Sequence, residues 1–225
     1  MLSISKSFKL TEGFFFLEKN EMNNNFLVAI RDFLKVYPDS ILVGAFAIRL
    51  GDYVRPVEEP RSTSDVDFVL ESNDFVEFVL SNQEIPDKLK DNFITSKRHQ
   101  FEHKNGVGID ILSHVMKSDF QMNRELLNFM MENLDKCSNI VTKYQITLRI
   151  AKPEFIIGSK LRYIIGNPKG IRKKDYEADC ERVLRYLLSE NKMENKDLVF
   201  IYLWPVEKDL WNEMEETARI QIQAD

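Results

Sequence analysis

The feature that most constrains this chain is an Asp-Val-Asp triplet, Asp65 to Asp67, inside an apolar run that ends at Leu70. Side chains of a β-strand alternate between two faces, so Asp65 and Asp67 share one face, with Cα atoms about 7 Å apart, while Val66 and Phe68 face a core. Two divalent cations about 4 Å apart are what in-line phosphoryl or nucleotidyl transfer uses. The triplet predicts a strand with a metal-binding face, although a solvated strand end has the same pattern.

A glycine turn precedes the triplet. Residues 41–43 read as a short buried strand, Gly44 as the turn, and the residues from Ala45 onward as a helix. Glycine at such a turn lets backbone N–H groups and a helix N-terminus come close to a phosphate. We therefore expect Gly44 and Ala45 to contact a phosphorylated ligand.

A third acidic residue follows a hairpin signal. The Asn105-Gly106 pair separates two strand-like runs within residues 101–112, and Asn-Gly favours a tight hairpin turn. Asp110 lies between two isoleucines of the second run, so it points away from their face. An ionised carboxylate in such a run is costly without a cation or hydrogen-bond donors. Asp110 is a candidate third metal ligand, and the alternative is a strand-end residue facing water.

The order strand, glycine turn, helix, Asp-x-Asp strand, hairpin and third Asp strand resembles the nucleotidyltransferase superfamily with the polymerase-beta-like fold. More narrowly, the chain is similar to the AbiEii-type branch, the toxin half of bacterial abortive-infection and toxin–antitoxin pairs. The residues that carry this resemblance are Gly44 to Leu50, then Arg61, Thr63, Asp65 and Asp67, then Lys160 within residues 157–165, and then Lys174, Asp175 and Asp179.

The chain departs from that branch in two places. Ala45 stands where the branch has Gly or Ser, which removes one hydroxyl ligand of the phosphate. The interval from Gly44 to Asp65 is also long, because residues 51–62 insert a polar, Pro-containing loop. Both departures concern the nucleotide side of the site.

The resemblance implies an α/β protein of the α+β kind. Residues 1–152 would form the nucleotidyltransferase core, a small mixed sheet with helices, and residues 153–225 a C-terminal helical bundle that closes over the site. The reaction implied is transfer of a nucleoside monophosphate from an NTP, with Mg²⁺ or Mn²⁺, to a hydroxyl of RNA, such as tRNA, or of a protein. An antitoxin protein is a possible partner.

The expected site has three metal-binding carboxylates, those of Asp65, Asp67 and Asp110, and Asp110 could instead accept the proton of the attacking hydroxyl. The resemblance implies that Lys160 stabilises the charge of the triphosphate. It also places Asp175 or Asp179 at the site as a catalytic or lysine-orienting acid, and we favour Asp175, which could otherwise serve the helix dipole. The residues expected at the nucleotide are Gly44, Ala45, Arg61, Thr63 and Lys160.

Hydrophobic periodicity supplies the remaining elements. Apolar residues at helical spacing predict a helix that follows Asn23 to Asn25 and ends at Pro38, and another over residues 123–134. Residues 144–150 alternate as a strand. Further helices are expected at residues 153–166, 175–189, 195–203 and 206–219.

Charge is distributed unevenly along the chain. The whole chain has a net charge of −5, yet residues 143–174 alone carry +8, which leaves −13 on the rest. Such a block is either a solvated face or a basic strip that contacts an RNA backbone or an acidic partner. The basic residues of this strip are Lys143, Arg149, Lys152, Lys160, Arg162, Lys169, Arg172, Lys173 and Lys174.

Two other functions fit the same motifs. An antibiotic adenylyltransferase would use the same chemistry on a small cationic acceptor and would need an acid-lined pocket. A catalytically silent member of the fold would act as a binding module, which the alanine at position 45 favours.

Several site classes are excluded. His99 and His103 have the spacing of a zinc pair on a helix, but on a strand that spacing covers about 13 Å, too far for one ion. Cys137 and Cys180 are far apart, as expected for reduced structural thiols. No apolar run is long enough for a signal peptide or a membrane span, so a cytoplasmic protein without membrane contact is expected.

Overall fold

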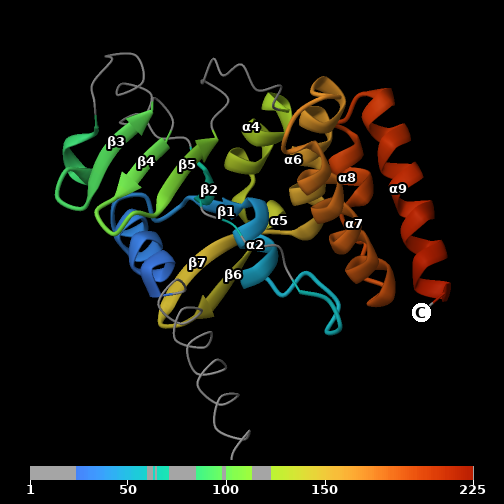
Figure 1. Ribbon diagram of the computed structural model, residues 1–225, viewed down its shortest axis with the longest axis horizontal. Helices are drawn as coiled ribbons and strands as arrows, with labels where there is room; N and C mark the ends of the chain where they lie inside the picture. The colour runs from blue at the N-terminus through green and yellow to red at the C-terminus, as the bar shows by residue number, and fades with distance from the viewer. Residues whose placement is uncertain are drawn as a thin grey trace, which may run out of the picture.

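A seven-stranded mixed sheet forms the centre of the computed structural model, which describes residues 24–59, 63, 65–70, 85–97, 100–112 and 123–224 (Figure 1). The strand order is β3-β4-β5-β2-β1-β7-β6. Together with the surrounding helices, this sheet confirms the predicted mixed α/β class. The strands are β1 (Ile41–Val43), β2 (Asp65–Val69), β3 (Phe93–Lys97), β4 (Gln100–His103), β5 (Gly108–Leu112), β6 (Ser138–Lys143) and β7 (Ile146–Ala151).

Four of the described helices follow the last strand of the sheet in the chain. A first helix covers residues 24–36, and α6 to α9 gather on one side of the sheet (Figure 1). Pro153 begins α6 directly after β7, as suits a residue without an N–H to donate. The division into units at residue 152 stays a prediction. The other helices are α2 (Gly44–Leu50), α4 (Arg124–Glu132), α5 (Leu134–Cys137), α6 (Pro153–Gly166), α7 (Lys173–Ser189), α8 (Lys196–Phe200) and α9 (Pro205–Ala224), with a 3₁₀ turn at Asp87–Leu89.

Strand β2 lies in the middle of the sheet. It pairs antiparallel with β1, which places Val43 opposite Asp67, and parallel with β5, which places Asp110 opposite Asp67. A one-residue slip of β2 would turn its buried residues to the other face, so this register is fixed by burial. The predicted hairpin is confirmed, since β4 and β5 pair antiparallel across Gly106, whose φ is +86°.

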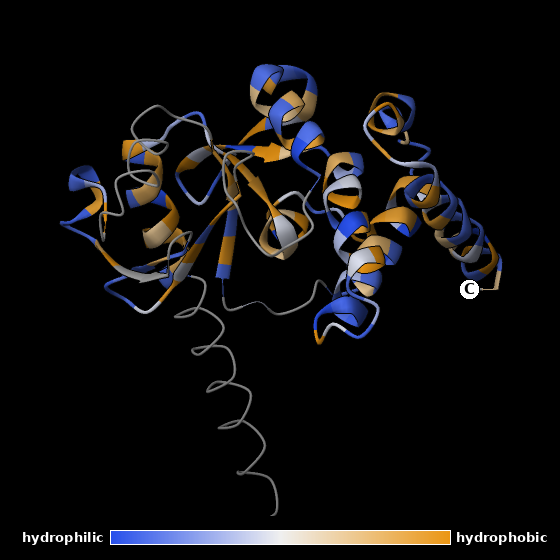
Figure 2. Ribbon diagram, turned by 90° about the horizontal axis from the view of Figure 1, so that it is seen from above, coloured by the Kyte–Doolittle hydropathy of each residue, from blue (hydrophilic) through white to orange (hydrophobic). Residues whose placement is uncertain are grey.

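Packing of helix 24–36 decides which face of β2 is the core. The ring of Phe33 stacks on Phe68 with centroids 4.7 Å apart and meets Phe93 edge-on at 6.4 Å. Val66 and Phe68 are fully buried, and Figure 2 shows hydrophobic residues along the central strands. The side chains of Asp65 and Asp67 alternate with these residues, so they lie on the opposite face of the strand.

Two further expectations, one about the cysteines and one about membrane-spanning helices, can be compared with the structure. Cys137 and Cys180 are buried and not joined in a disulfide, as predicted, and burial raises the pKa of each thiol to about 12. Among the described residues, no helix combines the length and apolar character that crossing a membrane requires.

Candidate functional site

Three carboxylates meet on one face of the sheet. Asp67 of β2 is directly opposite Asp110 of β5, and Asp65 is opposite Gly108 in the same register. We call Asp65, Asp67 and Asp110 the carboxylate set. Strand pairing alone therefore brings together three acids that are up to 45 residues apart in the sequence.

Gly44 lies against the carboxylate set. Its φ is +73°, and a Cβ built on it would be 1.9 Å from Oδ2 of Asp67. An L side chain is excluded here both by the backbone conformation and by the carboxylate. The sequence predicted that the glycine makes room for a phosphate, whereas in the structure the space of its missing side chain is taken by Asp67. Its contact with a phosphate stays a prediction.

The electrostatics of the set are dominated by Asp67. Burial raises the pKa of Asp67 to about 7, and repulsion from the charges of Asp110 and then Asp65 adds to the rise. The cationic side chains of Lys160 and Arg172 oppose it. At neutral pH Asp67 is therefore partly protonated, so the net charge of the set changes in this pH range. A bound cation would relieve the repulsion.

The raised pKa of Asp67 predicts how stability depends on pH. The folded protein holds the Asp67 proton more tightly than the unfolded chain, so this residue costs stability progressively as the pH rises from about 4 to about 7. Asp67→Asn cannot ionise. Without divalent ions, we expect the variant to be more stable than the parent at pH 8, by about 1 to 3 kcal/mol, and the difference to shrink towards pH 4.

Urea unfolding in EDTA at pH 4, 6 and 8 measures this difference. Asp209→Asn is the matched control, because Asp209 is exposed on α9. The assignment of the raised pKa is wrong if Asp67→Asn and the parent differ by the same free energy at all three values.

Helices α6 and α7 bring a lysine to the set. The Nζ of Lys160 donates to Oδ2 of Asp179 at 3.2 Å and lies 4.1 Å from the centre of the Tyr176 ring. Both members of the pair are buried, at 6% and 2% exposure. Asp179 is thus an acid that orients Lys160. Asp175 lies one turn earlier, in the first turn of α7. Our preference for Asp175 as the catalytic or lysine-orienting acid stays a prediction.

The other residues expected at the nucleotide have different surroundings. Thr63 donates from Oγ1 to Oδ1 of Asp65 at 2.7 Å, so it positions that carboxylate. The side chain of Ala45 is buried in the core at 3% exposure. Arg61 lies outside the described residues. A contact of any of the three with a nucleotide stays a prediction.

Arg172 is a site residue that we did not assign from the sequence. Its Nη1 and Nη2 are 3.4 Å and 3.5 Å from Oδ2 of Asp65, a residue 107 positions earlier. From the sequence, Arg172 was one member of the basic strip, with nothing local to single it out. Only the packing of α7 beside the sheet shows the contact.

The basic strip is divided among individual ion pairs. All of its residues lie in the described part of the chain, and six of them have a described acid within 4.0 Å. Residues far apart in the strip thus have separate acidic partners. The pairs are Lys143 with Asp52, Arg149 with Asp135, Lys160 with Asp179, Arg162 with Glu207, Arg172 with Asp65, and Lys173 with Glu177.

The carboxylate set fits a divalent metal ion in its chemistry but not in its present arrangement. Oxygen ligands suit Mg²⁺ and Mn²⁺, and repulsion around Asp67 indicates a place for positive charge. Within the described ranges, however, no three side chains of His, Cys, Asp or Glu are grouped so that they could hold a metal ion. Asp65 is instead engaged by Arg172 and Thr63. Metal binding by all three acids stays a prediction.

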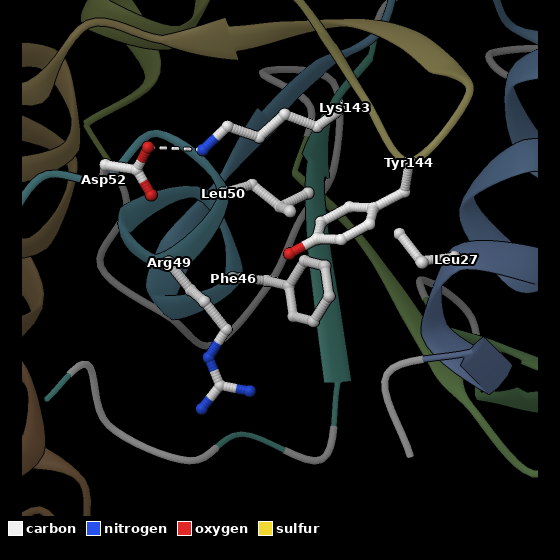
Figure 3. A pocket seen from close by; sticks show the side chains of 7 residues that line it. All are labelled: Leu27, Phe46, Arg49, Leu50, Asp52, Lys143 and Tyr144. Carbon is white, nitrogen blue, oxygen red and sulfur yellow. Dashed lines mark hydrogen bonds and ion pairs between the residues drawn. The ribbon is translucent and has the colours of Figure 1, made fainter. Parts of the chain in front are cut away.

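A pocket elsewhere in the molecule does not add to this site. Its cavity volume is about 60 Å³, far below the roughly 300 Å³ of a small-molecule site. Figure 3 shows Lys143 directed at Asp52 on its rim. The lining residues are Leu27, Phe46, Arg49, Leu50, Asp52, Lys143 and Tyr144, none of which belongs to the carboxylate set.

Of the two histidines rejected as a zinc pair, the structure describes only His103. His103 is buried and its Nε2 is 3.2 Å from Oδ2 of Asp32, so this ring connects β4 to helix 24–36. His99 lies outside the described residues.

Comparison with known proteins gives a distant structural likeness. The chain is similar to the crystal structure of an antigenic nucleotidyltransferase-like protein from Paracoccidioides brasiliensis, with 12% sequence identity and a TM-score of 0.45, over 83% of this chain and 89% of that one. No protein-family model and no curated protein matches the chain. A likeness this distant carries no argument about activity, which has to come from the site itself.

Proposed function

We propose that this protein is a metal-dependent nucleotidyltransferase that transfers a nucleoside monophosphate from an NTP to a hydroxyl group. The observation that supports this most is the pairing of Asp67 with Asp110 on neighbouring parallel strands, with Asp65 on the same face. Acids gathered in this way repel one another, as the pKa of Asp67 indicates. Strongly shifted pKa values cluster at functional sites, and carboxylate oxygens are suitable ligands for Mg²⁺.

Each residue of the site has a role in the proposed reaction. Asp65, Asp67 and Asp110 would hold Mg²⁺ or Mn²⁺, and a bound ion supplies charge neutralisation at the phosphates and activation of the acceptor hydroxyl. Asp110, the opposite neighbour of Asp67, is also a candidate for accepting the proton of that hydroxyl. Lys160, held by Asp179, offers an ammonium to the pyrophosphate that leaves.

The test is transfer of label. The purified protein is incubated with each α-labelled NTP, Mg²⁺ or Mn²⁺, and candidate acceptors, including total tRNA, the protein itself and an aminoglycoside. Covalent label that requires the metal supports the proposal, and the labelled acceptor identifies the substrate class. No label on any acceptor, together with no binding of metal or NTP, would contradict it.

RNA is our preferred acceptor. Lys169 and Lys174 are exposed beside Arg172, so a polymer backbone could follow the connection between α6 and α7 to the carboxylate set. If this is right, Lys169→Gln with Lys174→Gln weakens RNA binding and lowers its log–log salt slope by about 0.7 for each phosphate that is no longer neutralised, with NTP affinity unchanged. Lys160→Ala should do the opposite, because that lysine serves the nucleotide.

Both affinities, measured at several salt concentrations, separate these effects. A double variant that binds and modifies RNA like the parent would remove the support for a polymer acceptor and favour the small-molecule adenylyltransferase.

One observation favours a second candidate, a silent binding module of the same fold. The described residues contain no preformed metal group, and Asp65 is paired with a cation of the protein's own. A protein that binds NTP without any metal dependence and labels no acceptor would fit this alternative.

A toxin role, with an antitoxin as partner and the cytoplasm as location, is the biological setting that the family resemblance implies, and we include it in the proposal. The reading frame beside the gene is the observation that bears on it most directly.

A further inference from the structure

Arg172 contacts Asp65, one of the three candidate metal ligands. Its guanidinium lies with two nitrogens near Oδ2 of Asp65, while Oδ1 of the same carboxylate accepts a hydrogen bond from Thr63. Both oxygens of Asp65 therefore already have partners. The three acids share one face of the sheet, but among the described residues they do not form a preformed metal group.

The contact joins an exposed side chain to a partly buried one. The Arg172 side chain is 54% exposed and that of Asp65 is 13% exposed. Arg172 is the N-cap residue of α7, and the preceding Ile171 is 98% exposed. The guanidinium thus reaches Asp65 from the surface, and it can leave without disturbing the core.

A guanidinium and a metal ion compete for the same carboxylate, since both are cations that need its oxygens. A guanidinium has a second good partner, because its fork of N–H groups matches phosphate oxygens. An NTP bound with its metal would bring both a competitor for Asp65 and a new partner for Arg172.

We propose that Arg172 exchanges partners during the reaction cycle. It neutralises Asp65 while no divalent ion is bound, and it binds a phosphate of the nucleotide once metal and NTP have arrived. This inference rests on the proposed function and adds a regulated nucleotide contact to it. Its consequence is that metal and NTP bind cooperatively, since metal alone has to displace Arg172.

A different explanation is that the ion pair only fastens α7 to the sheet. Ion pairs with a partner this exposed contribute little to stability. An ion pair with only this structural role would change the free energy of unfolding of the variants. It would not change metal affinity and nucleotide affinity in opposite directions.

Three variants of the full chain test the inference: Arg172→Gln, Arg172→Lys and the control Lys136→Gln, which removes an exposed positive charge on α5, outside the candidate site. Affinity for Mn²⁺ alone, and for a non-hydrolysable NTP analogue with saturating Mn²⁺, is measured by calorimetry. Arg172→Gln should bind Mn²⁺ alone about 2- to 5-fold more tightly and the analogue about 10-fold more weakly. Arg172→Lys should lie between this variant and the parent, and Lys136→Gln should match the parent.

Each other outcome overturns the inference. Arg172→Gln could bind Mn²⁺ as the parent does, or more weakly. It could also lose both affinities together with stability in urea, which would show that the ion pair only fastens α7 to the sheet. In both cases the proposed function would survive if the parent binds Mn²⁺ and the analogue. Failure of the parent itself to bind either one would instead contradict the proposed function.

Discussion

Replacing Asp67 by asparagine is expected to lower the rate of nucleotide transfer by more than about 100-fold while the protein stays folded, because the change removes a charged oxygen ligand from the centre of the carboxylate set. The same result is expected for Asp110→Asn, since Asp110 is its direct neighbour in the sheet. Transfer from an α-labelled NTP, at saturating Mg²⁺, measures the rate.

Two controls show whether the loss of transfer is caused by the missing carboxylate of Asp67. Asp209→Asn changes an exposed acid on α9 and should transfer label like the parent. Circular dichroism and urea unfolding show whether Asp67→Asn has kept its fold, and we expect it to be at least as stable as the parent at pH 8. If Asp67→Asn keeps full metal-dependent transfer, the carboxylate set is not the active site.

Gly44→Ala is expected to have the largest effect on stability, with a loss of about 3 to 5 kcal/mol. The new Cβ would be 1.9 Å from Oδ2 of Asp67, and the φ of +73° is unfavourable for alanine. Either β1 or Asp67 has to move, so transfer activity should be lost as well. Urea unfolding gives the change in the free energy of unfolding.

Gly106 provides a matched control for this substitution. Its φ is +86°, similar to that of Gly44, but a Cβ built on it meets nothing within 4 Å. Gly106→Ala should therefore show only the backbone cost, about 1 kcal/mol. If both variants lose the same stability, the contact between Gly44 and Asp67 is not what requires a glycine.

Much of the fold was predictable because its signals are local. The helical spacing of apolar residues gave the helix at residues 24–36, and Pro153 marked the start of α6. Alternation gave β2, and the Asn-Gly pair gave the hairpin of β4 and β5. In each case one face of the element is buried, so its apolar residues recur along the sequence with the period of that element.

Strand β6 was missed for the opposite reason. Of its six residues only Ser138 is buried, so its sequence has no apolar alternation to recognise. The strand predicted to begin at Tyr144 begins at Ile146, because Tyr144 and Gln145 form the hairpin turn with φ values of 51° and 61°. Neither residue is a typical turn residue, since positive φ is usual for Gly, Asn and Asp.

The site was predictable where it depends on strands and not where it depends on the packing of helices. Alternation along β2 and β5 was enough to nominate the carboxylate set. Asp175 and Asp179 lie one turn apart on the same helix, so only the crossing of α6 and α7 decides which of them meets Lys160. The contact of Arg172 with Asp65 depends on the same crossing.

The central place of β2 in the sheet has a consequence for how this protein can fail. Asp67 has a neighbour on each side, Val43 in β1 and Asp110 in β5, so its position is maintained by backbone hydrogen bonds to two strands. Loops and helix ends open locally at low cost, whereas a central strand separates only when the whole domain unfolds. The acids of β2 are therefore among the last features to be lost on heating. If transfer activity is lost at a lower temperature than the fold, we expect that loss to begin in the helices beside the site, α6 and α7.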